Sequence, residues 1–201
     1  MKSQIITRAN FITTTRILLT PLFLYFLFGG REYFEIFALI IFIIASVTDA
    51  YDGYIARKYR EESPLGKFLD PLADKILMSA AFISFVVMGL IPLWMVLLVI
   101  LRDFMVTGIR ILMSAKDKTM VTRVSAKAKT GAQIGVVCFI LVYIITQRWK
   151  MFLGISDYVK FLEEYPIIYL LMLLVTLFTV WTGIEYIIVN RKAIKQYLKK
   201  S

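Results

Sequence analysis

The sequence predicts an all-α integral membrane protein with six transmembrane helices and a short N-terminal interfacial helix. Of its 201 residues, 59% are hydrophobic and the mean hydropathy is +0.74, well above the usage of soluble proteins. Six apolar runs are each long enough to cross about 30 Å of hydrocarbon. They cover residues 12–28, 33–56, 69–90, 93–113, 131–147 and 165–189. We expect residues 1–201 to form a single membrane domain with both termini in the cytoplasm.

The N-terminal segment is predicted to lie on the membrane surface. Residues 1–10 carry Lys2 and Arg8 among small polar residues, which favours a short interfacial helix. The run at 12–28 contains Pro21 and lacks a small-residue cleavage site, so we expect a first span and not a cleaved signal peptide.

The distribution of positive charge fixes the expected orientation. Of the 24 Lys and Arg residues, 17 lie in segments assigned to the cytoplasm and three within spans; the four assigned outside are Arg31, Arg148, Lys150 and Lys160. This asymmetry follows the positive-inside rule. Most of these charges orient the chain and attract anionic lipid, at about 1 kcal/mol each. The net charge of +10 is therefore explained by the membrane, and no nucleic-acid partner is expected.

Two pairs of aspartates interrupt apolar runs at the same expected depth. Asp49 and Asp52 lie near the cytoplasmic end of the second span, and Asp70 and Asp74 begin the third. At 1.5 Å per residue, Asp49 is about 24 Å from the outer end of its span and Asp74 about 27 Å from that of the next. A carboxylate in a membrane costs several kcal/mol. The sequence therefore predicts a functional site near the cytoplasmic surface.

Helical angles place these acids on common faces. At about 100° per residue, Asp49 and Asp52 share a sector of roughly 100° with Gly53 and Ala56, and Asp70 and Asp74 are about 40° apart. Four facing carboxylates cannot all stay ionised without a cation. The sequence has no histidine, so oxygen ligands favour Mg²⁺ or Mn²⁺ over zinc. The alternative is that the acids only pair with nearby cations, namely Arg57, Lys67 and Lys75.

These residues carry a resemblance to a known family. The pattern D-x2-D-G-x2-A-R-x8-G-x3-D-x3-D, from Asp49 to Asp74, resembles the signature of the CDP-alcohol phosphotransferases. The six-span plan extends the likeness over essentially the whole chain. The resemblance implies two divalent ions that grip the diphosphate of a CDP-linked lipid. Asp49 and Asp70 would bridge both ions, Asp52 would hold one, and Asp74 would hold the other and accept the proton of the attacking hydroxyl.

The resemblance also suggests how the donor lipid is bound. Gly53, Arg57 and Ser63 match positions that contact the cytidine nucleotide. The flanking motifs NFITTTR, LRDFMVTGIR and AKAKT are similar to those of phosphatidylglycerophosphate synthases within the family. By this likeness the first motif would contribute Asn10 and Thr13 to donor binding, although Ala9 stands where a proline is usual.

The expected acceptor is sn-glycerol 3-phosphate. Five cations are candidates for binding its phosphate. Arg16 completes the first motif, and the others lie on the expected cytoplasmic side of the third, fourth and fifth spans: Lys75, Arg110, Lys127 and Lys129. The implied reaction converts CDP-diacylglycerol and glycerol 3-phosphate into phosphatidylglycerophosphate and CMP. The resemblance further implies a homodimer among the lipids of a bacterial plasma membrane, with the active site at the cytoplasmic face.

Several alternatives remain open at this point. Within the family, inositol phosphate or a second lipid would serve as acceptor. A divalent-cation transporter would place acids near the membrane midplane along a path, and an intramembrane prenyltransferase has a different acid spacing. In the fourth span, Arg102 and Asp103 are expected to form a structural pair.

Overall fold

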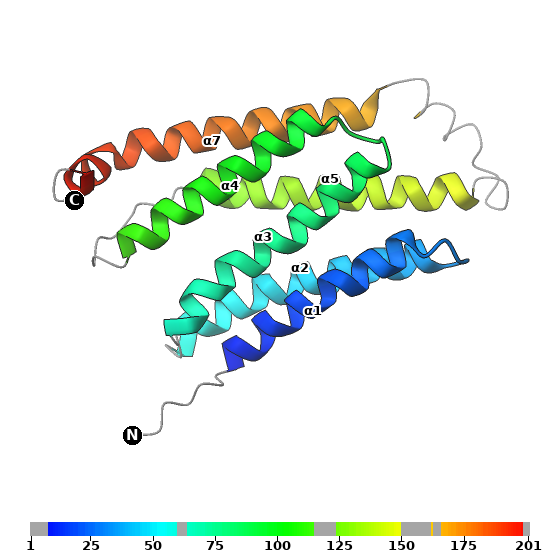
Figure 1. The fold of residues 1–201 in the computed structure, drawn as a ribbon, viewed down its shortest axis with the longest axis horizontal. Helices are drawn as coiled ribbons and strands as arrows, with labels where there is room; N and C mark the ends of the chain where they lie inside the picture. Colours follow the sequence, from blue (N-terminus) through cyan, green and yellow to red (C-terminus); the bar gives the residue numbers. More distant parts are fainter. Residues whose placement is uncertain (1–7, 60–63, 115–123, 150–161, 163–165, 199–201) are drawn as a thin grey trace. The chain divides into compact units, whose positions relative to one another are not determined.

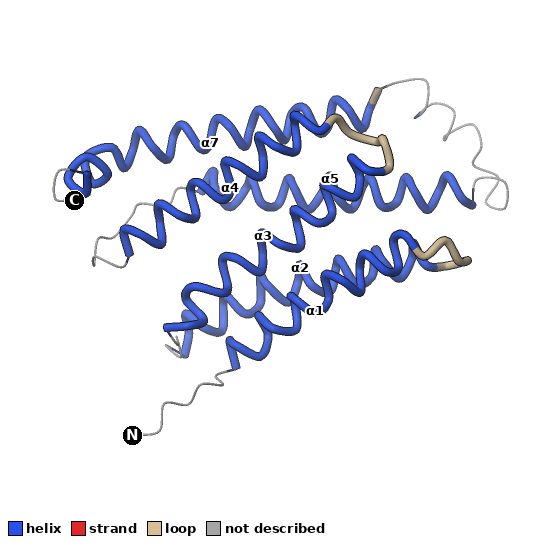
Figure 2. Tube along the Cα trace, in the orientation of Figure 1, coloured by secondary structure: helices blue, strands red, loops and turns tan. Residues whose placement is uncertain are grey.

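The computed structural model describes residues 8–59, 64–114, 124–149, 162 and 166–198. Within its helices, the side chains at 8–14, 49–59, 64–74, 114, 124–127, 192, 193 and 195–198 lie outside this description. The described residues form helices joined by turns and contain no strand (Figures 1 and 2). In chain order the helices are α1 Arg8–Phe28, α2 Phe34–Tyr59, α3 Pro64–Val87, α4 Leu93–Ser114, α5 Val124–Trp149 and α7 Ile167–Leu198.

The chain forms two compact units. The first contains Met1–Ser84 and Val137–Pro166, and the second contains Phe85–Val136 and Ile167–Ser201. The predicted all-helical class is confirmed for the described residues. By length and composition, Ala128–Trp149 and Ile167–Arg191 are able to span a membrane, with mean hydropathies of 1.8 and 2.3. These two helices suit a membrane protein, and six spans with cytoplasmic termini stay a prediction.

Most helices extend beyond the apolar runs that predicted them. α5 begins at Val124 although its apolar run begins at 131, and α7 continues to Leu198 although its run ends at 189. A helix forms its backbone hydrogen bonds in water as well as in lipid, so polar residues prolong it past the hydrocarbon. α1 likewise begins at Arg8, so part of the predicted interfacial segment continues the first long helix. Residues 1–7 lie outside the described part.

In the first unit, α1 and α2 form a helical hairpin (Figure 1). The turn uses two left-handed residues, Gly30 with φ of 66° and Tyr33 with φ of 67°. A Cβ at Gly29 would lie 2.4 Å from the Phe34 ring, so only glycine fits there. The Phe26 ring centroid is 5.0 Å from that of Phe34 and closes the hairpin.

Arg148 ties the end of α5 to this hairpin. Its guanidinium forms an ion pair with the buried carboxylate of Glu35, and Nη2 donates to the backbone oxygen of Gly30 at 2.6 Å. The neighbouring Trp149 ring lies 5.0 Å from that of Tyr33, measured between centroids. Arg148 therefore has a structural function besides the topological one that the sequence suggested.

α3 is terminated by a glycine in the left-handed conformation, shortly before α4 begins. Gly89 has φ of 73°, its N–H donates to Val86 O at 2.9 Å, and Leu90 N–H donates to Phe85 O at 2.9 Å. These two bonds define a Schellman motif, which satisfies carbonyls at a helix end. Pro92 then precedes α4, so the chain cannot continue α3.

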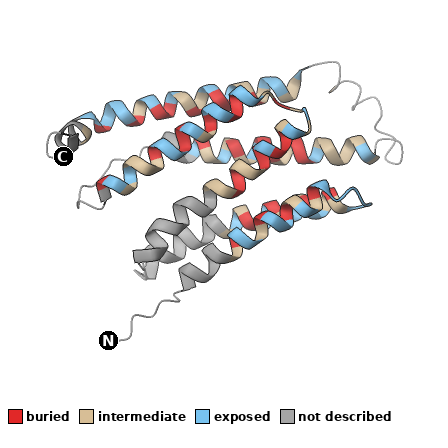
Figure 3. Ribbon diagram, viewed as in Figure 1, coloured by how far each residue is buried: buried red, intermediate tan, exposed pale blue. Residues whose placement is uncertain are grey.

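In the second unit, α4 packs against α7. Each helix has one buried face and one exposed apolar face (Figure 3). On α4, Met95, Val99 and Val106 are buried, whereas Leu101 is 66% exposed. Exposed leucines along a long apolar helix suit contact with lipid tails. The buried face of α4 is interrupted by an arginine and an aspartate, which are described below.

Candidate functional site

The four aspartates of the signature lie on two helices of the first unit. Asp49 and Asp52 belong to α2, and Asp70 and Asp74 belong to α3. Both helices are continuous through these positions, so the helical spacing assumed from the sequence holds for the backbone. The side chains of all four lie outside the described part, and their expected contact with metal ions stays a prediction.

The chain connection limits how far apart the two acid pairs can be. Tyr59 ends α2 and Pro64 begins α3, so five Cα–Cα steps of about 3.8 Å allow at most about 19 Å between them. From this connection the two helices run in opposite directions (Figure 1). Asp52 is seven residues before Tyr59 and Asp70 six after Pro64, which puts both about 10 Å along their helices. The backbone is thus compatible with the two aspartate pairs lying at the same depth along α2 and α3.

The residues predicted to bind the donor lipid are placed only in part. Gly53 and Arg57 continue α2 beyond the aspartates, and Asn10 and Thr13 lie in the first turns of α1. The side chains of Arg57, Asn10 and Thr13 lie outside the described residues, as does the whole of Ser63.

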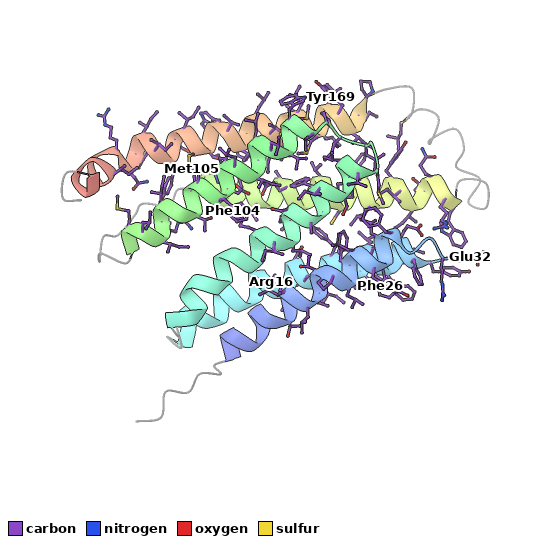
Figure 4. The ribbon with its side chains drawn as sticks, in the orientation of Figure 1. Arg16, Phe26, Glu32, Phe104, Met105 and Tyr169 are labelled. Carbon is purple, nitrogen blue, oxygen red and sulfur yellow. The ribbon has the colours of Figure 1, made fainter. Side chains whose placement is uncertain are left out.

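Among the predicted phosphate-binding cations, Arg16 and Lys75 belong to the first unit. Arg16 lies on α1 with 4% of its surface exposed (Figure 4), and its backbone oxygen accepts from Thr20 Oγ1 at 3.2 Å. Lys75 directly follows Asp74 on α3 and is half-buried. A buried guanidinium requires anionic or polar partners, so the burial of Arg16 is compatible with a role in binding charge.

Arg110 is the exposed cation of α4. Its guanidinium carbon lies 5.8 Å from the ring centroid of Tyr186 on α7, a cation–π distance. Tyr186 is 7% exposed, and its hydroxyl has no hydrogen-bond partner among the described residues. Tyr186 is buried and Arg110 exposed, so the ring lies beneath the guanidinium. No pattern in the sequence selects Tyr186.

Lys129 has a different environment. It is 2% exposed, and its Nζ lies 2.6 Å from Oδ1 of Asp103 on α4. Gln133, one turn further along α5, donates to the other oxygen of Asp103 at 3.3 Å. Lys127 lies on the same helix, but its side chain is outside the described part.

The predicted pair of Arg102 and Asp103 is present and belongs to a larger network. Arg102 Nη1 donates to Asp103 Oδ1 at 3.1 Å, and Nη2 donates to Thr182 Oγ1 on α7 at 3.0 Å. A Cβ at Gly183 would lie 2.8 Å from Arg102 Cγ, so the arginine stem rests on the α7 backbone. The sequence predicted the pair but not the other members of the network. One available signal was the i, i+4 spacing of Lys129 and Gln133, which puts both on one helix face.

The described side chains contain no group of three or more His, Cys, Asp or Glu residues that could hold a metal ion. The signature aspartates of α2 and α3 are not among these described side chains, and they stay the predicted metal ligands. Four carboxylates supply hard oxygen ligands, which is the donor set of Mg²⁺ or Mn²⁺.

Comparison with known proteins gives the family. The family model of CDP-alcohol phosphatidyltransferases matches residues 6–181. A Bacillus subtilis protein named CDP-diacylglycerol–glycerol-3-phosphate 3-phosphatidyltransferase is 37% identical over 92% of this chain and 96% of its own. A Cereibacter sphaeroides protein of the same name is 37% identical over 62% of this chain and 58% of its own.

A Mycobacterium tuberculosis protein named probable phosphatidylglycerophosphate synthase is 35% identical over 55% of this chain and 54% of its own. The family match covers both signature helices and most of the second unit. The chain therefore belongs to the CDP-alcohol phosphatidyltransferase family.

Proposed function

We propose that the protein is a CDP-diacylglycerol–glycerol-3-phosphate 3-phosphatidyltransferase. The observation that carries this proposal is the 37% identity to the Bacillus subtilis enzyme of that name over 92% of this chain. The unbroken aspartate signature along α2 and α3 supports the same chemistry. The substrates would be CDP-diacylglycerol, held in the bilayer by its acyl chains, and water-soluble sn-glycerol 3-phosphate.

The reaction is a displacement at phosphorus. The 1-hydroxyl oxygen of glycerol 3-phosphate forms a bond to the lipid-side phosphorus of the donor, the bond from that phosphorus to the bridging oxygen breaks, and CMP leaves. Asp74 accepts the hydroxyl proton, the role that its place in the family signature suggests. Because the sequence has no histidine, the base must be a carboxylate, Tyr, Lys or water, and Asp74 meets this condition. Gly53, Arg57 and Ser63 bind the nucleotide part of the donor, with help from Asn10 and Thr13.

The metal requirement follows from the chemistry of the ligands. Asp49, Asp52, Asp70 and Asp74 would hold two divalent ions, Mg²⁺ or Mn²⁺, which stabilise charge on the attacking and leaving oxygens when bound.

The acceptor phosphate needs cations of its own. The proposed ligands are Arg16, Lys75, Arg110, Lys127 and Lys129. Their described environments differ, because Arg110 is exposed while Lys129 is bound to Asp103. A guanidinium at the surface can form a bidentate contact to an incoming phosphate without first losing another partner. Arg110 is therefore the strongest candidate for the first contact.

One assay tests the proposal. Purified protein is incubated with CDP-diacylglycerol and, separately, glycerol 3-phosphate, glycerol, inositol, inositol phosphate, serine and phosphatidylglycerol, and CMP and lipid products are measured. We expect CMP and phosphatidylglycerophosphate with glycerol 3-phosphate only. Equal use of unphosphorylated alcohols would overturn the proposed acceptor, and no CMP release with any alcohol would overturn the reaction.

A further inference from the structure

The Asp103 cluster consists of Arg102, Asp103, Lys129, Gln133 and Thr182, all in the second unit. Each of the five residues is at most 9% exposed. Asp103 lies at the centre of the cluster. Both of its carboxylate oxygens accept hydrogen bonds, and two of the donors, Arg102 and Lys129, are cations. One carboxylate thus joins α4 to α5 directly and to α7 through Arg102.

Such a cluster is an expensive way to stabilise a protein. Removing charges from water costs several kcal/mol per ion, and an apolar replacement of a buried ion pair is often as stable. The best-attested use of buried ionic groups is to fix the register of neighbouring elements. The cluster therefore fits a positioning role better than a purely stabilising one.

The cluster has a fixed relation to the exposed Arg110. Asp103 and Arg110 are seven residues apart on α4, so they lie within about 20° of one helical face and about 10.5 Å apart along the axis. Tyr186, which supports Arg110, is three residues after Gly183, where Arg102 rests on α7. The same two helices thus carry both the cluster and the Arg110 support.

We propose that Asp103 is a positioning residue for acceptor binding: it orients the Lys129 ammonium directly and, through Arg102 on Thr182 and Gly183, holds α7 against α4 beneath Arg110. This inference rests on the proposed function and deepens it, because it assigns to the acceptor side a carboxylate that touches neither substrate.

The main test is a double-mutant cycle on Asp103 and Lys129. We measure the KM for glycerol 3-phosphate and for CDP-diacylglycerol in D103N, K129Q and D103N/K129Q. D103N should raise the glycerol 3-phosphate KM about tenfold or more, as expected for loss of a charge-assisted bond, and leave the donor KM within about twofold. D103E should recover part of the loss. If Asp103 acts through Lys129, the double variant should resemble K129Q.

Additive effects in the cycle would overturn the route through Lys129, and equal rises in both KM values would overturn the positioning role as a whole. A second pair of variants keeps the test decisive if D103N does not fold. G183A would place a Cβ 2.8 Å from Arg102 Cγ, whereas a Cβ at Gly135 on α5 meets nothing within 4 Å. G183A should raise the acceptor KM severalfold and G135A should not. Equal kinetics of the two variants would contradict the inference.

The wild-type assay distinguishes a failure of this inference from a failure of the proposed function. Wild-type protein that forms no phosphatidylglycerophosphate overturns the proposed function. Wild-type protein that forms it, with a D103N variant whose two KM values change in parallel, overturns only the role of Asp103.

Discussion

Lys129 and Asp103 are 26 positions apart in the sequence, and their Nζ and Oδ1 atoms lie 2.6 Å apart in the buried part of the second unit. A lysine that the sequence identifies only as a cation near an expected phosphate site thus has a carboxylate partner. Arg110, on the same helix as Asp103, is exposed. The two predicted phosphate ligands should consequently respond differently to substitution.

The first prediction concerns Arg110. Arg110→Ala should raise the KM for glycerol 3-phosphate roughly tenfold to a hundredfold, since a charge-assisted hydrogen bond contributes about 1.5–3 kcal/mol. The KM for CDP-diacylglycerol should change little. Arg191→Ala, which removes another exposed arginine of the second unit, is the matched control and should leave both values unchanged. Parallel increases in both KM values for Arg110→Ala would exclude an acceptor-specific role.

The second prediction concerns the proposed base. Asp74→Asn keeps the size of the side chain but cannot accept the hydroxyl proton, so turnover should fall by at least about a hundredfold. Folding is monitored by size-exclusion chromatography in detergent. Glu32→Gln removes an exposed carboxylate from the α1–α2 turn and should retain full turnover. An Asp74→Asn enzyme within about threefold of wild type would show that another group takes the proton.

The third prediction concerns the metal ions. Chelation with EDTA should abolish CMP release, and added Mg²⁺ or Mn²⁺ should restore it, because four carboxylates need divalent cations for charge balance. Asp49→Asn should require a higher Mg²⁺ concentration for half-maximal turnover. Unchanged turnover in thoroughly chelated protein would contradict metal-assisted chemistry.

The fourth prediction concerns the stability of the first unit. Arg148→Ala leaves the buried Glu35 carboxylate without its cation and removes the bond to Gly30 O, which should cost about 1–3 kcal/mol. The apparent Tm in detergent should fall by several degrees, measured by intrinsic tryptophan fluorescence or light scattering. Adding Glu35→Gln should recover part of the loss, because the unpaired charge is then removed.

Arg31→Ala is the control for this fourth experiment. Arg31 is exposed in the same turn, and its guanidinium carbon lies 5.8 Å from the Phe34 ring centroid. An exposed cation–π contact contributes about 0.5–1 kcal/mol, so the control should lose less. A larger loss in Arg31→Ala than in Arg148→Ala would contradict the proposed importance of the Arg148 contacts.

Features that depend on local sequence were predicted well. The apolar runs indicated the helices because length and hydropathy are local properties, and the signature aspartates do lie on two successive helices. The ends of the helices were less accurate: α3 begins at Pro64, five residues before its apolar run. Proline is favoured in the first turn of a helix, and this capping signal is independent of hydropathy.

The sequence by itself determined the helical class, the family signature and the pairing of Arg102 with its neighbour Asp103, because each depends on residues close together in the chain. Only the tertiary structure decided that Asp103 also binds Lys129 and Gln133, that Arg102 reaches Thr182, and that Arg110 stands over Tyr186. These partners come from different helices. Helical periodicity gives the face on which each residue lies, but the packing of α4 with α5 and α7 determines which faces meet.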